Sequence, residues 1–249
     1  MDAQWVLNGC SMDAPYNVRP RKMRNIAVIL AGGIGSRVGG ETPKQLLPLA
    51  DGRSILEHSI DAFEASPSID EIAVVMHPDH ISSLQKLCRS NSWQKLTKII
   101  PGGAERWESS YNAIKAYTES ANLDDPLSLL LHDAARPFVS QRIIADVCQA
   151  LETHEAVTVA VPVTDTIYEV RNNEVQEVKN RRDFMRAQTP QAFHLHLIAE
   201  AFEDAIKKGY ITSVTDDVAV LKAFNPSIPV FIVPGEESNK KITYPEDIK

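Results

Sequence analysis

The sequence has 249 residues, of which 43% are hydrophobic, and its formal net charge is −7. This size and composition allow one α/β domain with a substantial core, or two small domains. The acidic balance argues against general nucleic-acid binding, which usually depends on a basic surface. No apolar run approaches the roughly 18 residues of a membrane-spanning helix. We therefore expect neither a nucleic acid nor a membrane as a partner.

The three cysteines are Cys10, Cys88 and Cys148, which are widely spaced and form no CxxC pair. This pattern disfavours a disulfide framework and a zinc site, and it favours a reducing, cytoplasmic location. Residues 1–25 show no clear periodicity and lack the apolar core of a secretory signal. We predict that they form a disordered extension, with Met23 directly before the first strand.

The stretch Ile26–Leu47 is the most informative part of the sequence. Its apolar start, Ile26–Leu30, predicts a strand that is buried on both faces. The loop that follows contains Arg37 and Lys44, and it has glycines at positions 32, 33, 35, 39 and 40. Glycines allow backbone N–H groups to approach phosphate oxygens, and fixed cations offset the phosphate charge. The stretch therefore predicts a site for a nucleoside triphosphate.

Beyond this loop, predicted strands alternate with predicted helices. The helices are expected at about Ser54–Phe63, His80–Cys88, Glu108–Tyr117, Arg142–Leu151, Leu195–Lys207 and Asp216–Phe224, and the strands at Ile72–Met76, Leu96–Ile100, Leu127–Leu131, Ala156–Val161 and Val230–Val233. This order indicates a Rossmann-like α/β fold, a mostly parallel sheet flanked by helices. Ligands of such sheets bind beyond the carboxyl ends of the strands. The loops 32–44, 102–106 and 133–136 should therefore lie along one edge.

A different pattern interrupts this series. The segments Thr166–Val170 and Glu174–Val178 alternate around Asn172 and Asn173, which predicts a β-hairpin inserted into the α/β domain. We expect a domain at 26–249 with a protruding arm at about 163–184. A two-stranded hairpin is marginally stable alone, so the arm should pack against another surface, for which a second subunit is one candidate.

Two common phosphate-binding motifs do not fit the first loop. Gly35 and Gly40 satisfy GxxxxG, but Glu41 occupies the position of the Walker lysine, so the loop is not a P-loop. Val38 occupies the position of the third dinucleotide-fold glycine, and no acidic residue ends the strand at Ile72–Met76. What remains is a Gly-rich loop, an arginine and a Pro-Lys pair.

This combination resembles the nucleotidyltransferases, and further motifs narrow the resemblance to the polyol-phosphate cytidylyltransferases. These enzymes act on 2-C-methyl-D-erythritol 4-phosphate or on ribitol 5-phosphate. The similarity covers Ile26–Asp247. Its motifs, in the expected order, are PGGAER at 101–106, HDAARP at 132–137, VPVTDT at 161–166, QTPQAF at 188–193, TDD at 215–217 and NKKIT at 239–243.

The resemblance implies a reaction and roles for individual residues. A phosphate oxygen of the acceptor would attack the α-phosphorus of CTP and release pyrophosphate. A phosphate monoester is already mostly dianionic at pH 7, so no Ser-His-Asp device is required. Arg37, Lys44 and Lys241 would stabilise the transition state, with Mg²⁺ bridging the triphosphate. The residues expected to bind the nucleotide are Ala31, Gly32, Gly33, Gly35, Gly103 and Ser109.

The same resemblance implies a homodimer, because the family's acceptor is held partly by the arm of the partner subunit. The expected acceptor-binding residues are Asp133, Thr166, Arg181 and Thr215, with Asp133 also near the metal. Arg182 directly follows Arg181, so either arginine can be the phosphate ligand. The remaining residues of interest have no definite role in the reaction. His132 is either a structural or an active residue, and Arg106 and Arg136 are expected to form structural ion pairs. Trp93 and Trp107 are expected to pack in the protein rather than stack on a base.

The sequence leaves two candidates for the identity of the acceptor. The loop at Ala31–Arg37 looks more like the ribitol-phosphate branch, whereas Ala135 in HDAARP looks more like the methylerythritol branch. We expect 2-C-methyl-D-erythritol 4-phosphate, of the non-mevalonate isoprenoid pathway, with ribitol 5-phosphate for CDP-ribitol as the alternative. The family usually continues into a helix beyond the point that corresponds to Lys249.

Two more distant alternatives are a sugar-1-phosphate nucleotidyltransferase that uses UTP or GTP, and an inactive regulatory module of the same fold. The TPKQL sequence and the arm argue against the first. The presence of Arg37, Lys44 and Lys241 argues against the second.

Overall fold

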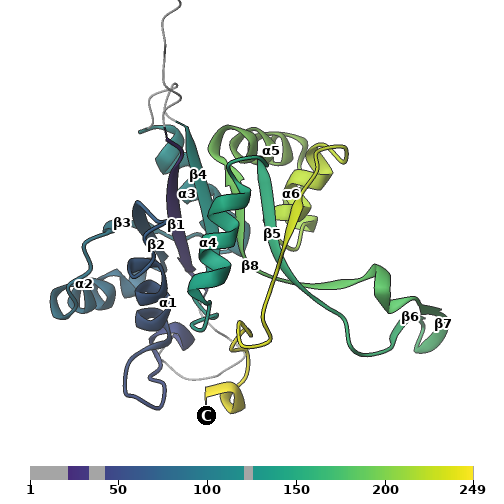
Figure 1. Ribbon diagram of the computed structural model, residues 1–249, viewed down its shortest axis with the longest axis horizontal. Coiled ribbons are helices and arrows are strands. Elements are labelled where there is room, and N and C mark those ends of the chain that lie inside the picture. The colour runs from purple at the N-terminus through teal and green to yellow at the C-terminus, as the bar shows by residue number, and fades with distance from the viewer. Residues whose placement is uncertain (1–21, 34–42, 121–125, 249) are drawn as a thin grey trace, which may run out of the picture.

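A seven-stranded sheet with helices on both faces forms the body of the protein (Figure 1). The structure is a computed structural model, and it describes residues 22–33, 43–120 and 126–248. The strand order is β3-β2-β1-β4-β8-β5-β9, and strands β6 and β7 form a separate two-stranded sheet. The β1–β2, β1–β4, β2–β3 and β5–β9 pairs are parallel. The predicted fold class, with its inserted hairpin, is therefore confirmed.

The elements follow the expected alternation closely. The strands are β1 (Arg24–Ala31), β2 (Glu71–Met76), β3 (Leu96–Pro101), β4 (Leu127–Asp133), β5 (Ala156–Pro162), β6 (Ile167–Arg171), β7 (Glu174–Lys179), β8 (Met185–His194) and β9 (Phe231–Pro234). The helices are α1 (Ile55–Glu64), α2 (Ile81–Ser90), α3 (Arg106–Thr118), α4 (Gln141–Ala150), α5 (Leu195–Lys208) and α6 (Asp217–Phe224).

The domain begins slightly earlier than predicted. Strand β1 starts at Arg24, which pairs in register with Leu127 and forms an ion pair with Glu71 at 2.9 Å. The last two residues assigned to the disordered extension, Arg24 and Asn25, therefore belong to the sheet. Residues 1–21 lie outside the described residues.

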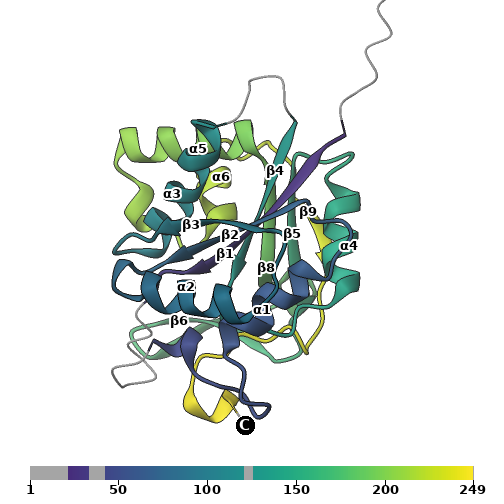
Figure 2. The same ribbon diagram turned by 90° about the vertical axis from the view of Figure 1, so that its left-hand side faces the viewer.

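The core has two layers, one on each face of the sheet (Figure 2). Successive side chains of a strand point to opposite faces. In β1, Ile26 and Val28 pack toward α3, α5 and α6, whereas Ala27 and Ile29 pack toward α1, α2 and α4. This arrangement explains why β1 reads as a continuous apolar run, and it confirms that the strand is buried on both faces.

Strand β8 was not predicted. It runs antiparallel between β4 and β5, in the middle of the sheet. The sequence of this segment does not resemble a buried strand. Gln188, Thr189 and Gln191 are polar yet buried, and Pro190 has no N–H to donate to a neighbouring strand. The pairing accommodates the proline: the β5 partners shift from Gln191 directly to Gln188, so Pro190 has no partner in β5.

The arm formed by β6 and β7 projects away from the body (Figure 1). Asn172 and Asn173 have φ angles of 51° and 62°, the left-handed values that a two-residue hairpin turn of type I′ requires. The predicted turn is therefore confirmed.

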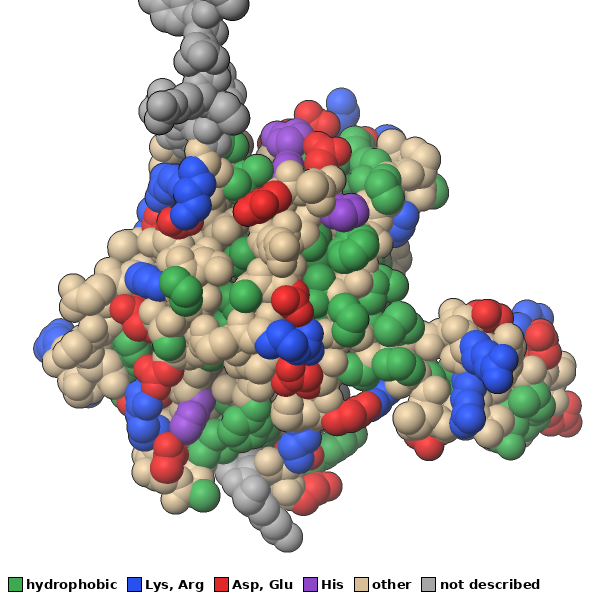
Figure 3. Space-filling model, viewed as in Figure 1, with side chains coloured by type: hydrophobic (Ala, Val, Ile, Leu, Met, Phe, Trp, Pro, Cys, Tyr) green, Lys and Arg blue, Asp and Glu red, His purple; other side chains and the backbone are tan. Residues whose placement is uncertain are grey.

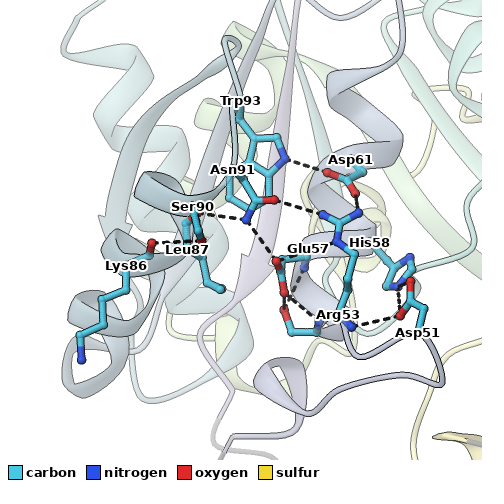
Figure 4. Close-up of polar contacts among 11 residues, drawn as sticks. Asp51, Arg53, Glu57, His58, Asp61, Lys86, Leu87, Ser90, Asn91 and Trp93 are labelled. Carbon is cyan, nitrogen blue, oxygen red and sulfur yellow. Dashed lines mark hydrogen bonds and ion pairs between the residues drawn. The ribbon is translucent and has the colours of Figure 1, made fainter.

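A polar network fixes the segment between the Gly-rich loop and α1 (Figure 4). The Ser54 hydroxyl accepts the Glu57 N–H at 3.2 Å, and the Glu57 carboxylate accepts the Ser54 N–H at 2.8 Å, so the two residues cap the start of α1 reciprocally. The Asp61 carboxylate accepts hydrogen bonds from the Arg53 guanidinium and, at 2.7 Å, from Trp93 Nε1. The network thus ties the loop before α1 to the segment after α2.

Among the helices of the described residues, none is long and apolar enough to cross a membrane.

Replacing Asp61 should reveal the contribution of this network to stability. Asp61→Ala removes the acceptor of both Arg53 and Trp93, so we expect the free energy of unfolding to fall by about 1–2 kcal/mol in urea titrations. Asp146→Ala is the control, because Asp146 pairs with Arg142 on an exposed helix face, and it should cost no more than about 0.5 kcal/mol. Equal effects of the two substitutions would contradict this role for Asp61.

Candidate active site

A cavity of about 380 Å³ lies beyond the carboxyl ends of β1, β3 and β4. In the sheet order, the chain runs outward from β1 through β2 to β3 and then returns to β4 on the other side of β1. The cavity therefore lies at the point where the strand order reverses, the usual binding position in open α/β sheets. Its charged lining residues are Lys44, Glu105, Arg106, Asp133 and Lys241.

Glycines allow the loops after β1 and β3 to pack closely against the first turn of α3 at this edge. A Cβ atom on Gly32 would lie 2.6 Å from Ser109 Oγ, and one on Gly103 would lie 2.1 Å from the Cβ of Glu108. The Gly103 N–H donates to Ser109 Oγ at 3.2 Å. A larger residue at 32 would meet Ser109 of α3 and one at 103 would meet Glu108 of α3, so both glycines are required by the packing of the cavity wall against this helix.

Gln45 holds the Gly-rich loop against the short helix η1 (Lys44–Leu46). Its buried Nε2 donates to the carbonyls of Ala31 at 2.6 Å and Gly33 at 3.0 Å. In a trans peptide the C=O and the next N–H point in opposite directions, so the Gly32 N–H points away from Gln45. The amide therefore fixes the orientation of the first peptide of the loop.

The segment that follows β9 closes the other side of the cavity. Lys44 Nζ donates to the carbonyl of Ile242 at 2.6 Å, and Lys241, Thr243 and Lys44 all line the cavity. Lys44 and Lys241 thus line the same cavity although 197 positions separate them in the sequence (241 − 44).

Asp133 is the electrostatic centre of the cavity. One carboxylate oxygen lies 2.7 Å from Lys241 Nζ, and the other lies 3.4 Å from Arg106 Nε. Burial acts to raise the pKa of Asp133, but Arg106 and Lys241 outweigh it and hold that pKa well below its usual range. Asp133 is therefore ionised throughout the physiological pH range.

Arg106 links Asp133 to the start of α6. Its Nη2 donates to Asp217 at 2.8 Å, and the Asp217 side chain is only 1% exposed. Burial acts to lower the pKa of Arg106, but Asp217 and Asp133 more than offset it and raise that pKa. Arg106 was predicted to be an ion-pair partner, and these two contacts confirm the prediction.

His132 is structural. The ring is fully buried beside Phe63, its Nε2 lies 3.1 Å from the Arg136 carbonyl, and its Nδ1 lies 3.1 Å from Thr189 Oγ1. The Arg136 carbonyl can only accept, so the ring proton is on Nε2, and Nδ1 accepts from the Thr189 hydroxyl, which itself accepts the Asp133 N–H. Burial lowers the pKa of His132 to about 4, and the hydrogen bonds offset only part of this effect. The ring is therefore neutral at pH 7.

Arg136 holds the C-terminal segment in place. Its Nη1 donates to the Asn239 carbonyl at 2.8 Å and its Nη2 to the Ala187 carbonyl at 3.3 Å. Arg136 was predicted to be an ion-pair partner. In the described part of the chain its hydrogen bonds go instead to these two carbonyls. Arg136 therefore joins its own loop to the backbone at Ala187 and at Asn239 rather than pairing with a carboxylate.

The structure brings most of the predicted site residues together. Those that line the cavity are Ala31, Gly32, Gly33, Lys44, Gly103, Ser109, Asp133 and Lys241. Gly35 and Arg37 lie outside the described residues. Thr215 lines a second cavity of about 400 Å³, which shares Glu105 and Arg106 with the first.

Two predicted residues do not reach either cavity of their own chain. Thr166 and Arg181 are exposed at the base of the arm, where Arg181 Nη1 donates to the Thr164 carbonyl. Arg182 is also exposed, so the geometry favours neither arginine as a phosphate ligand. Both predicted packing residues, Trp93 and Trp107, contact the core clusters.

Comparison with known proteins identifies the family. The family model described as 2-C-methyl-D-erythritol 4-phosphate cytidylyltransferase matches residues 25–249. The chain belongs to this family. The predicted family and enzyme class, a cytidylyltransferase among the nucleotidyltransferases, are confirmed.

Individual relatives agree with this assignment. The chain is 43% identical over 243 residues to the 2-C-methyl-D-erythritol 4-phosphate cytidylyltransferase of Thermobifida fusca, an alignment that covers 96% of this chain and 94% of that protein. The solved structure of 4-diphosphocytidyl-2C-methyl-D-erythritol synthase from Anaerococcus prevotii superposes with a TM-score of 0.77 at 28% identity, covering 90% of this chain and 92% of that one.

A third relative has a different name. The bifunctional ribulose 5-phosphate reductase/CDP-ribitol pyrophosphorylase of Haemophilus influenzae is 37% identical over 229 residues. The alignment covers 91% of this chain but only 47% of that longer protein.

Two residues that support the cytidylyltransferase site were not singled out from the sequence. Gln45 appeared only as part of the TPKQL motif, and Thr189 only as part of QTPQAF. The signal for Gln45 was its position directly after the Pro-Lys pair. Nothing in the sequence near Thr189 indicated its role, because the residues it bonds to, Asp133 and His132, are distant in the sequence.

Protonation of His132 should weaken the fold in acid. The imidazole of the unfolded chain takes up a proton below about pH 6.5, whereas the folded ring stays neutral down to about pH 4. The unfolded state therefore binds more protons in this window, and stability falls as the pH falls, by about 3 kcal/mol in total. His132→Asn, which cannot titrate, should lack this component of the pH dependence of the free energy of unfolding. Parallel curves for the two proteins would contradict it.

Proposed function

We propose that this enzyme transfers the cytidylyl group of CTP to 2-C-methyl-D-erythritol 4-phosphate and releases pyrophosphate. The observation that carries the proposal is the placement of Lys44 and Lys241 in one cavity with the Gly32–Gly33 loop, in a chain of this family. Two lysines and a Gly-rich backbone segment then line the same cavity, which is the combination that binding a triphosphate requires.

The proposed reaction is one in-line displacement. An oxygen of the acceptor phosphate forms a bond to the α-phosphorus of CTP, and the bond from that phosphorus to the bridging oxygen breaks as pyrophosphate leaves. The acceptor phosphate is already mostly dianionic at pH 7, so no side chain has to remove a proton. Catalysis then depends on positioning and on stabilisation of negative charge. We assign that charge stabilisation to Lys44 and Lys241, with Arg37 as the third predicted member.

We infer that Mg²⁺ enters as part of the CTP substrate. No cluster of three acidic, histidine or cysteine ligands occurs in the described ranges, so these residues do not form a protein cage for a metal. Mg²⁺ at nucleotide sites is usually held by phosphates and one or two carboxylates. Asp133 is a carboxylate on this cavity, and it fits such a role. The ion would neutralise phosphate charge.

We propose that two copies of the chain pair through the arm. Tyr168 lies opposite Val178 and Val170 lies opposite Val175, so these four residues form one apolar face of the hairpin. Each is more than half exposed, and Figure 3 shows apolar and charged side chains interspersed on the arm. Burial of this face on a partner would stabilise the hairpin.

Dimerisation through the arm would also complete the acceptor site. Thr166 and Arg181 lie at the base of the arm and line neither of the two cavities described above, so a partner's cavity is where we expect them to meet an acceptor phosphate. Thr215, on the second cavity, would contact the acceptor from the other side. We place the enzyme in the cytoplasm, because the free thiols of Cys88 and Cys148 suit a reducing compartment.

Ribitol 5-phosphate is the second candidate acceptor. The Haemophilus influenzae relative, which is named as a CDP-ribitol pyrophosphorylase in part, supports it. Both acceptors are phosphorylated polyols, so the donor half of the reaction is the same for both.

Pyrophosphate release with CTP and each acceptor distinguishes the two. We expect kcat/KM for 2-C-methyl-D-erythritol 4-phosphate to exceed that for ribitol 5-phosphate by at least about tenfold, because a site that hydrogen-bonds hydroxyl groups discriminates between their arrangements. The opposite preference would assign the ribitol substrate. Turnover with neither acceptor would refute the proposed function.

Lys44→Ala should lower kcat by at least about 100-fold, the scale of losing one donor to the transition state. The matched control is Lys240→Ala: Lys240 is exposed, faces Asp247 at 3.8 Å and does not line the cavity. Its kcat should stay close to that of the unmodified enzyme. Near-normal turnover by Lys44→Ala would reject the role assigned to Lys44.

A further inference from the structure

Lys241 already pairs with an anion in the structure, and that anion competes with the substrate for its charge. In the structure its ammonium group lies 2.7 Å from the Asp133 carboxylate. Stabilisation of the transition state requires the same group to meet phosphate oxygens. An ammonium group has three N–H donors and can contact both anions, but a lysine that exchanges Asp133 for a phosphate gives more of its charge to the transition state.

Only the side chain of Lys241 can make this exchange, because the backbone on both sides is held by the core. Asn239 is fully buried and its Nδ2 donates to the Thr189 carbonyl at 2.9 Å. The Ile242 N–H donates to the Ala135 carbonyl at 2.8 Å. The Lys241 side chain is 40% exposed and lines the cavity, so it has room to turn about its own bonds.

The departure of Lys241 would leave Asp133 as a charged group in a nearly buried position. The Asp133 side chain is only 12% exposed. A buried carboxylate without a partner is strongly unfavourable. The second cation, Arg106, removes this difficulty, because its Nε lies 3.4 Å from the other carboxylate oxygen.

Arg106 is itself held in place from the opposite side. Its Nη2 donates to Asp217 at 2.8 Å, and the other oxygen of Asp217 is buried with no hydrogen-bond partner in the described part of the chain. Asp217 is fixed in turn, since the Asp217 and Val218 N–H groups donate to Gln191 Oε1 at 3.1 and 3.2 Å. A guanidinium can donate hydrogen bonds to two carboxylates at once through N–H groups on different edges of its plane. A lysine ammonium cannot reach both carboxylates in the same geometry.

We propose that Arg106, anchored on Asp217, is a positioning residue that keeps Asp133 paired and in place while Lys241 turns from Asp133 to a substrate phosphate. Arg106 acts through Lys241 and touches no reacting atom in this scheme. The inference rests on the proposed function, because it assumes that Lys241 meets a phosphate.

A double-mutant cycle tests whether Arg106 acts through Lys241. We expect Arg106→Gln to lower kcat about tenfold in the otherwise unmodified enzyme, with KM for CTP changed less than about threefold, since the affected contact is stronger in the transition state than in the CTP complex. In the Lys241→Ala background no lysine has to turn, so Arg106→Gln should lower kcat less than in the unmodified enzyme, although it then leaves Asp133 without a cation and should lower the free energy of unfolding more. Arg106→Lys, which keeps the charge, should retain more of kcat than Arg106→Gln.

The outcomes separate this inference from the proposed function. Equal loss of kcat on Arg106→Gln in both backgrounds would overturn the positioning role and leave the cytidylyltransferase activity intact. Absence of turnover in the unmodified enzyme would refute the activity itself. Arg142→Gln is the control, because Arg142 pairs with Asp146 and Glu236 on the surface, and it should leave kcat unchanged in both backgrounds.

A structural measurement tests the exchange without using turnover. In crystals of the unmodified enzyme with a non-hydrolysable CTP analogue and Mg²⁺, we expect Lys241 Nζ to have left Asp133 while Arg106 remains within hydrogen-bonding distance of it. Lys241 still bound to Asp133, or Arg106 departing together with Lys241, would overturn the proposal. This measurement also decides the question if Arg106→Gln does not fold.

Discussion

The site depends on one buried charge and on the cations that keep it paired. Asp133 ends the central strand β4 and is nearly buried, so it can remain ionised only because Arg106 and Lys241 contact its two oxygens. Each cation comes from a different part of the chain, one from the start of α3 and one from the segment after β9. The carboxylate thereby joins the Gly-rich wall of the cavity to its C-terminal wall.

Polar residues in the middle of the sheet carry this arrangement. Gln188 Nε2 donates to the Glu236 carbonyl at 2.8 Å, and Thr189 connects the Asp133 N–H to His132. Both residues belong to β8, so an antiparallel strand in a mostly parallel sheet supplies hydrogen bonds where apolar residues would supply only packing. The fold therefore gives up some apolar core to fix the segment that contains Lys241.

The sequence predicted what depends on local pattern. Helix α1 was predicted to within a residue of its observed bounds, and the hairpin turn was predicted from Asn172 and Asn173. Strand β8 was not readable, because the hydrogen bonds that allow its polar residues to be buried come from distant segments. The cavity edge was predicted from the strand-end rule, whereas the pairing of Lys241 with Asp133 is visible only in the folded structure. The local sequence pattern thus identified the Gly-rich loop as the nucleotide site. Only the tertiary contacts showed how β8 and the segment after β9 support that site.

The central claim is that CMP passes directly from CTP to the acceptor, with the protein supplying position and charge but no nucleophile. The stereochemical course at the α-phosphorus tests it most directly. With a CTP analogue that carries sulfur at one defined position of the α-phosphate, one in-line displacement predicts inversion of configuration in the product. Net retention would indicate two successive displacements through a covalent enzyme intermediate, and it would contradict the account.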